Sequence, residues 1–156
     1  MFAVEHWLVE TARSAGPPSL ADLNGYRHTL SADAVRKIRR DHGYSSKERA
    51  RGNLPVTEDD LRAIPGILRT PDAVSFGSRT RAGLEAIGYA KRNRSEMLIL
   101  VEEVRTGREN LNVVTMWKRP AATDVRSTGD ALRLYVRNDP RADANVVLSP
   151  ARRKGR

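Results

Sequence analysis

The stretch from Met97 to Lys118 constrains the fold most, because two β-favouring runs flank a short polar segment. The first run, Met97–Arg105, is almost continuous Leu, Ile and Val, which predicts a strand buried on both faces for most of its length. The polar segment Thr106–Asn110 contains a Gly and an Asn, which tolerate the positive φ of a hairpin loop. The second run, Leu111–Lys118, alternates as a strand does. The stretch therefore predicts a hairpin on which the rest of the chain packs.

Regular alternation in the second run assigns its side chains to two faces. One face would carry Leu111, Val113, Thr115 and Trp117, and the other Asn112, Val114, Met116 and Lys118. Arg119 then shares the face of Thr115, whereas Lys118 points away. Either the strand bulges here, or only one of the two cations lies beside Thr115. Glu102 and Glu103 in the first run are expected near the turn.

Two amphipathic helices are predicted before the hairpin. Residues 1–14 have apolar positions at helical spacing before Gly16 and Pro17, which predicts a short helix that packs on the core or docks on a partner. The second segment, Arg27–Gly43, has Ser31 as N-cap and Gly43 as C-terminal cap. His42 continues its buried stripe, and His28 lies in the loop before it. Its outer surface is cationic and comprises Arg36, Lys37, Arg39 and Arg40.

The remaining segments complete an α+β order. Residues 44–55 are polar and predict a loop, and Thr57–Asp60 resembles a capping box that starts a helix interrupted at Pro65. Strands are predicted at Val74–Phe76 and Ala86–Arg92, and an edge strand at Leu132–Val136. Helices followed by an antiparallel meander are typical of the α+β class.

Composition narrows the classes of function. The 156 residues fit one domain, and 28 Lys and Arg against 19 Asp and Glu give a net charge of +9, which favours a polyanionic partner, nucleic acid before an anionic membrane surface. The absence of cysteine excludes disulfides, thiolate catalysis and Cys-based zinc sites. No HExxH, His-x-His or clustered Asp pattern indicates a metal site, so we expect no metal or cofactor. We expect no membrane span and no secretion signal, because no apolar run approaches ~20 residues and no cationic-apolar leader follows Met1.

Four pieces in a fixed order carry a family resemblance. They are RHTLSADAVRKIRRDHG, LRAIPGILRTPDAV, IGYAKRN and VVTMWK, and they span Arg27 to Lys118. In this order the chain resembles phage-borne nucleases of the barnase, EndoU, colicin and RelE-like fold. The resemblance implies N-terminal helices packed on a four-stranded antiparallel sheet, and a metal-independent ribonuclease activity. It also suggests a division into an N-terminal helix and linker at 1–26, a nuclease domain at 27–137 and a basic tail at 138–156.

The chemistry of metal-free RNA cleavage assigns candidate residues. The reaction needs a base for the 2′-hydroxyl proton, an acid for the leaving 5′-oxygen, and positive charge for the phosphate. His28 and His42 are the candidate acid and base, Lys91 and Lys118 supply charge, and Thr115 donates a hydrogen bond to a phosphate oxygen. The predicted RNA-binding residues are Arg36, Lys37, Arg39, Arg40 and Arg119.

Three functions from different classes are consistent with the sequence. The first is a toxin-like, phage-associated endoribonuclease that cuts tRNA or mRNA to a 2′,3′-cyclic phosphate, with an immunity or antitoxin protein as a further partner. The second is a nucleic-acid-binding module without turnover. The third is a structural component of a phage particle that docks through the N-terminal helix. The expected location is the cytoplasm of the host or producing cell, or the interior of a phage particle.

Overall fold

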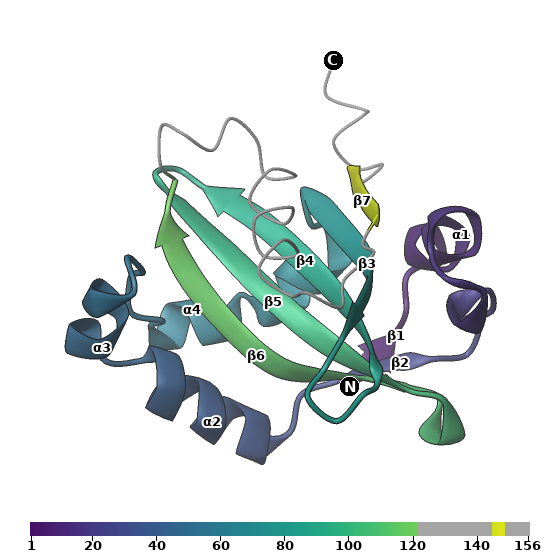
Figure 1. The fold of residues 1–156 in the computed structure, drawn as a ribbon, viewed down its shortest axis with the longest axis horizontal. Helices are drawn as coiled ribbons and strands as arrows, with labels where there is room; N and C mark the ends of the chain where they lie inside the picture. Colours follow the sequence, from purple (N-terminus) through teal and green to yellow (C-terminus); the bar gives the residue numbers. More distant parts are fainter. Residues whose placement is uncertain (122–144, 149–156) are drawn as a thin grey trace.

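The computed structural model describes residues 1–121 and 145–148, which form a mixed sheet with helices around it (Figure 1). The α-helices are α1 (His6–Ala15), α2 (Ala32–His42), α3 (Ser45–Ala50), α4 (Glu58–Arg62) and α5 (Ile64–Arg69). The strands are β1 (Phe2–Ala3), β2 (Arg27–Thr29), β3 (Ala73–Arg79), β4 (Glu85–Asn93), β5 (Glu96–Arg105), β6 (Asn110–Pro120) and β7 (Asn145–Leu148). Two 3₁₀ turns, η1 (Pro18–Leu20) and η2 (Thr106–Arg108), complete the described elements.

The α+β class is confirmed, but the expected four-stranded antiparallel sheet is wrong. The described strands form one seven-stranded sheet in the order β1-β2-β6-β5-β4-β3-β7. The antiparallel meander β3 to β6 is its centre, and β2 pairs with β6 in parallel. The added strands β1, β2 and β7 have only two to four residues each. Such short segments are below the length at which alternation can be recognised.

The central hairpin is confirmed, and a bulge in β6 decides its faces. Val101 pairs with Thr115 whereas Glu102 pairs with Val113, so Val114 is an extra residue in β6. Regular alternation therefore fails at this point: Met116 and Lys118 are buried on the side of Leu111 and Val113, and Thr115 turns to the other face with Trp117 and Arg119.

Two details of the hairpin differ from the prediction. The residue with positive φ in the loop is Glu109, at 51°, not a Gly or Asn. Glu102 and Glu103 are both buried inside the sheet instead of lying near an exposed turn, since β5 is covered on both faces from Met97 to Val104.

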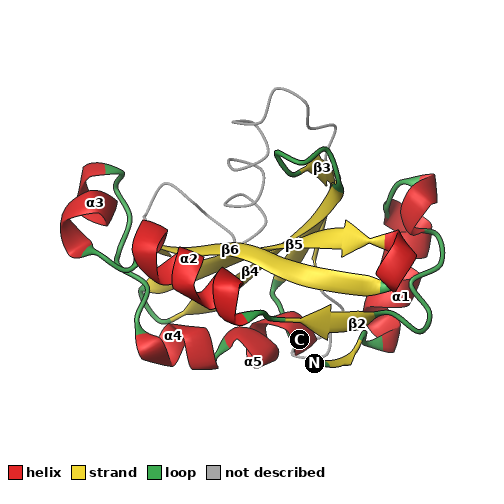
Figure 2. Cartoon of the chain, turned by 90° about the horizontal axis from the view of Figure 1, so that it is seen from below, coloured by secondary structure: helices red, strands yellow, loops and turns green. Residues whose placement is uncertain are grey.

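The main core lies between one face of the sheet and the helices. Figure 2 shows α4 and α5 across this face and α2 alongside β6. The helices contribute Leu8, Ile38, Leu61, Ile64, Ile67 and Leu68, and the sheet contributes Phe76, Ile87, Leu100, Leu111, Val113 and Met116 among others. A smaller cluster on the opposite face contains Ala73, Ala90, Met97 and Ile99, with Trp117 packed against it.

Several local predictions hold and others need correction. Ser31 caps α2 by accepting a hydrogen bond from the Ala34 amide, and Thr57 and Asp60 form the predicted capping box. The first helix begins at His6 because residues 2–3 pair with β2. His28 lies in β2 and not in a loop, and the predicted loop after Gly43 contains α3.

Predictions for the C-terminal part fall largely outside the described residues. The predicted edge strand Leu132–Val136 and the basic tail after Pro150 lie there, and only β7 is described, which pairs with β3. Within the described chain, no helix is both long and apolar enough to cross a membrane.

Candidate active site

The last residue of α2 meets the bulged part of β6. His42 Nε2 lies 3.4 Å from Thr115 Oγ1. The ring of His42 also lies beside that of Trp117, with 6.3 Å between the centroids. The side chain of His42 is 18% exposed, so the imidazole has a route to solvent. Two of the predicted site residues, His42 and Thr115, are therefore brought together.

A buried carboxylate lies behind His42. Glu48 of α3 has no exposed surface, and its Oε1 lies 3.3 Å from His42 Nδ1. This separation is in ion-pair range, but the two groups are not aligned as a hydrogen bond. Glu48 Oε1 also accepts from Arg51 Nη1 at 2.8 Å, and its Oε2 accepts from Asn53 Nδ2 at 3.1 Å. These contacts hold the carboxylate in place beside the imidazole.

Glu48 is a site residue that the sequence analysis missed. It sits in SSKERA, which the analysis treated as a polar loop. A usable signal was present, because Glu48 and Arg51 are three residues apart, the spacing of neighbours on a helix surface.

Taken together, these contacts give His42 the surroundings of a general base. One ring nitrogen faces a fixed carboxylate, and the other faces a hydroxyl at the partly open side. A histidine oriented by a third group is the usual arrangement for proton transfer at neutral pH.

His28 lies elsewhere, in a buried polar cluster. Its Nδ1 is 2.7 Å from Glu102 Oε1, and Tyr89 donates its hydroxyl proton to Glu102 Oε2 at 2.6 Å. All three side chains are buried. Burial raises the pKa of Glu102 above its usual value, although the hydrogen bonds from His28 and Tyr89 act in the opposite direction. Burial, and then the charge of Glu102, raises the pKa of Tyr89 well above its usual value.

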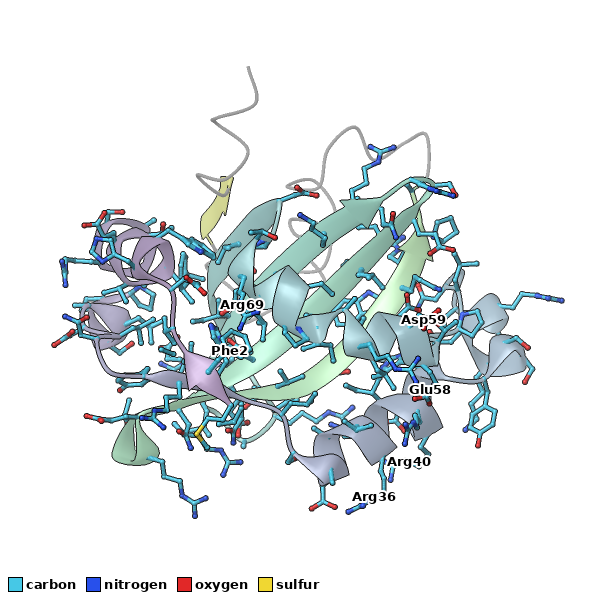
Figure 3. The ribbon with its side chains drawn as sticks, turned by 180° about the vertical axis from the view of Figure 1, so that it is seen from behind. Phe2, Arg36, Arg40, Glu58, Asp59 and Arg69 are labelled. Carbon is cyan, nitrogen blue, oxygen red and sulfur yellow. The ribbon has the colours of Figure 1, made fainter. Side chains whose placement is uncertain are left out.

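The outer side of His28 is closed by the N-terminal strand. Phe2 pairs with His28 in the sheet, and the two rings are 4.9 Å apart. The guanidinium of Arg69 covers the Phe2 ring at 4.5 Å, and Figure 3 shows these two side chains together. His28 Nε2 is buried and has no hydrogen-bond partner among the described residues. The structure therefore does not bring His28 to His42.

The two candidate lysines occupy the helix-covered face and have partners. Lys118 is buried, and its Nζ lies 2.8 Å from Asp60 and 3.5 Å from Glu96. Lys91 donates to the carbonyl oxygen of Thr70 at 2.6 Å. Both lysines pair in register with Leu98, one from each neighbouring strand. Thr115 points to the opposite face, so neither lysine lies beside it.

Most of the cationic surface of α2 is paired with acidic side chains. Arg36 pairs with Asp33, Arg40 with Asp41, and Arg39 makes two hydrogen bonds to Glu58 at 2.7 and 2.8 Å. Figure 3 shows Arg36 and Arg40 on α2 and Glu58 at the start of the neighbouring helix α4. Lys37 has no acidic partner within ion-pair distance in the described part of the chain.

Arg119 is the predicted RNA-binding residue nearest in sequence to the site. It lies on β6 two residues beyond Trp117 and pairs in register with Met97. It makes no ion pair with the described residues. Nor do residues 1–121 bring three or more His, Asp or Glu side chains into a group that could hold a metal ion.

One family matches most of the chain. The sequence model of the family described as phage-Barnase-EndoU-ColicinE5/D-RelE like nuclease 3 matches residues 8–125. This range includes His42, Glu48 and Thr115. No curated protein and no solved structure matches the chain significantly.

Proposed function

Because the chain belongs to the phage-Barnase-EndoU-ColicinE5/D-RelE like nuclease 3 family, we propose that it is an endoribonuclease that works without a metal ion. The observation that carries the proposal is the contact of His42 Nε2 with Thr115 Oγ1 at 3.4 Å, with Glu48 behind the ring. Family membership supplies the nuclease class. The side chains at this contact supply what cleavage by the 2′-hydroxyl requires.

In the proposed reaction, the 2′-oxygen of one nucleotide attacks the adjacent phosphorus. The bond from O2′ to phosphorus forms, and the bond from phosphorus to O5′ breaks. His42 Nε2 takes the 2′-hydroxyl proton, and the departing 5′-oxygen takes a proton from a second acid or from water. Thr115 donates a hydrogen bond to a non-bridging phosphate oxygen, and Arg119 adds positive charge on the same face. The products are a 2′,3′-cyclic phosphate and a free 5′-hydroxyl.

Three other candidates from the sequence need further conditions to act in this reaction. His28 would require that Phe2 move away, since its Nε2 is buried. Lys118 would have to leave Asp60, and Lys91 would act from the helix-covered face. We therefore base the proposal on His42 and Thr115.

The deciding experiment is cleavage of a defined RNA oligonucleotide in EDTA. We expect turnover, with the cyclic phosphate identified by mass spectrometry. The same oligonucleotide with a single 2′-deoxyribose at the cut should resist, because the nucleophile is gone. Cleavage of this analogue at the normal rate, or turnover only after Mg²⁺ is added, would overturn the mechanism.

The alternatives are a nucleic-acid-binding module and a phage structural component of the same fold. Either would show no turnover with or without metal, and only the first would bind RNA. The proposed substrates are tRNA or mRNA, the proposed setting is the host cytoplasm or a phage particle, and an immunity protein is the proposed inhibitor. The apolar face of α1 packs in the core through Leu8, Val9 and Ala12, so docking on a phage protein would use its outer face.

A further inference from the structure

A small pocket lies along the seam between α2 and β6, next to the candidate active site. Ser31, Lys37, Arg105, Asn112 and Val114 are among its lining residues, and its volume is about 200 Å³. Pockets that hold whole small molecules usually have volumes of about 300 to 1,000 Å³. This pocket is therefore suited to one chemical group and not to a complete nucleotide.

The pocket contains the unpaired cation of α2. Its three basic neighbours on the helix, Arg36, Arg39 and Arg40, are each held by a carboxylate. Lys37 is exposed and has no acidic partner within ion-pair distance in residues 1–121. Its charge is thus available to an incoming anion, whereas an anion at the three arginines must compete with a carboxylate.

Two further side chains add hydrogen-bond donors to the pocket. Arg105 pairs with Glu103 through Nε at 2.8 Å and Nη2 at 2.7 Å, which fixes the guanidinium in the wall. A guanidinium has five N–H donors, so two contacts leave others for a ligand. Asn112 contributes an amide, whose oxygen contacts the Thr29 hydroxyl. Asp33 also lines the pocket, but its side chain is 87% exposed and is paired with Arg36.

The position of the pocket relates it to the candidate active site. Val114 in its wall directly precedes Thr115, and Asn112 is three residues from Thr115, which is at most about 10 Å along a strand. An RNA strand with its scissile phosphate at Thr115 can therefore place a neighbouring phosphate here.

We propose that this pocket binds an RNA phosphate that flanks the cleaved bond, with Lys37 as its principal charge. This inference rests on the proposed function, because that function identifies the ligand as RNA. A lysine ammonium binds phosphate as a point charge, and the guanidinium and amide donors orient the oxygens. Contacts to phosphate fix the register of the strand and carry no sequence information.

The test measures binding to an uncleavable 2′-O-methyl oligonucleotide by fluorescence anisotropy over a range of salt concentrations. Lys37→Gln removes one positive charge, and Arg81→Gln is the matched control on the exposed loop between β3 and β4. For a single-stranded ligand, the loss of one phosphate contact should lower the slope of log K against log salt by about 0.7. We expect this change for Lys37→Gln and wild-type behaviour for Arg81→Gln. Equal slopes in both variants and the wild type would overturn the inference.

A second arm locates the phosphate. Each phosphate of the oligonucleotide is replaced in turn by a neutral methylphosphonate. We expect one position beside the cleavage point at which neutralisation weakens wild-type binding but has no further effect on Lys37→Gln. Additive losses at every position would overturn the inference. Because the ligand cannot be cleaved, a protein that binds in this way yet shows no turnover would contradict only the proposed function, and turnover with an unchanged Lys37→Gln slope would contradict only this inference.

Discussion

His42 and Thr115 are 73 residues apart in the chain, yet His42 Nε2 and Thr115 Oγ1 lie 3.4 Å from each other. The relationship depends on two local features. Ser31 and Gly43 fix the ends of α2, so His42 is its last residue. The extra residue Val114 turns Thr115 out of the face that carries Leu111 and Val113. A strand with regular alternation would place Thr115 in the main core.

We expect His42→Ala to lower kcat by about 10² to 10⁴-fold, the usual contribution of a general acid or base. Thr115→Val should lower kcat with little change in KM, because its hydrogen bond is made mainly in the transition state. Initial rates at saturating RNA measure both effects, and thermal unfolding shows whether the variants fold. His6→Ala is the matched control, since His6 is exposed on α1 and pairs only with Glu10. A folded His42→Ala variant with wild-type turnover would remove His42 from the mechanism.

Glu48 should act on the reaction only through His42. Glu48→Gln keeps the shape of the side chain but removes the charge facing His42 Nδ1. A contact with a charged group contributes about 1.5 to 3 kcal/mol, which corresponds to a fall in kcat of about 10 to 100-fold. KM should not change, because the buried Glu48 cannot contact RNA. Steady-state kinetics beside Glu10→Gln, an exposed substitution of the same kind, measure the effect. A change in KM alone would contradict the positioning role.

The ion pair of Lys118 with Asp60 predicts a stability that depends on pH. Burial alone would raise the pKa of Asp60, but hydrogen bonds from Lys118 and Thr57 outweigh it and hold the pKa below its usual 3.8. A lowered pKa in the folded state stabilises the protein above pH ~3.8, and this stability is lost as the pH falls through the lowered value. Lys118→Gln should therefore be destabilised by about 1 to 3 kcal/mol near neutral pH. Denaturant titrations should show the two proteins converging at acid pH. A constant difference down to pH ~2 would contradict this account.

Local signals predicted the parts of the fold that local interactions determine. The caps of α2, the capping box at Thr57 and the hairpin of β5 and β6 each depend on residues close in sequence, and all three are confirmed. The position of His28 was wrong because β2 is three residues long and exists through its pairing with Asn110–Asn112. No window of sequence around His28 contains that information.

The candidate site was predictable only in part, for the same reason. The sequence identified His42 and Thr115 by residue type, and it raised a bulge as one of two solutions for the β6 faces. It did not show which solution holds, because the register of β5 on β6 decides it. Glu48 was missed since its role arises from the packing of α3 below His42. The partners of Lys118 and Lys91 also come from distant segments, Asp60 in α4 and Thr70 after α5.

The buried cluster of His28, Glu102 and Tyr89 predicts a loss of stability at alkaline pH. Burial and the Glu102 carboxylate raise the pKa of Tyr89 well above 10 in the folded protein. Above pH ~10 the unfolded chain releases this proton while the folded chain keeps it, so the free energy of unfolding falls by up to ~1.4 kcal/mol per pH unit from this group. Tyr89→Phe should lose stability at neutral pH, by about 1 to 3 kcal/mol, since Glu102 Oε2 loses its donor. Its alkaline limb should nevertheless be shallower than that of the wild type. Denaturant titrations from pH 8 to 11 compare it with Tyr44→Phe, which alters an exposed tyrosine and should follow the wild-type limb. Parallel limbs for Tyr89→Phe and the wild type would show that Tyr89 ionises equally in both states, and a buried hydroxyl bound to Glu102 cannot do so.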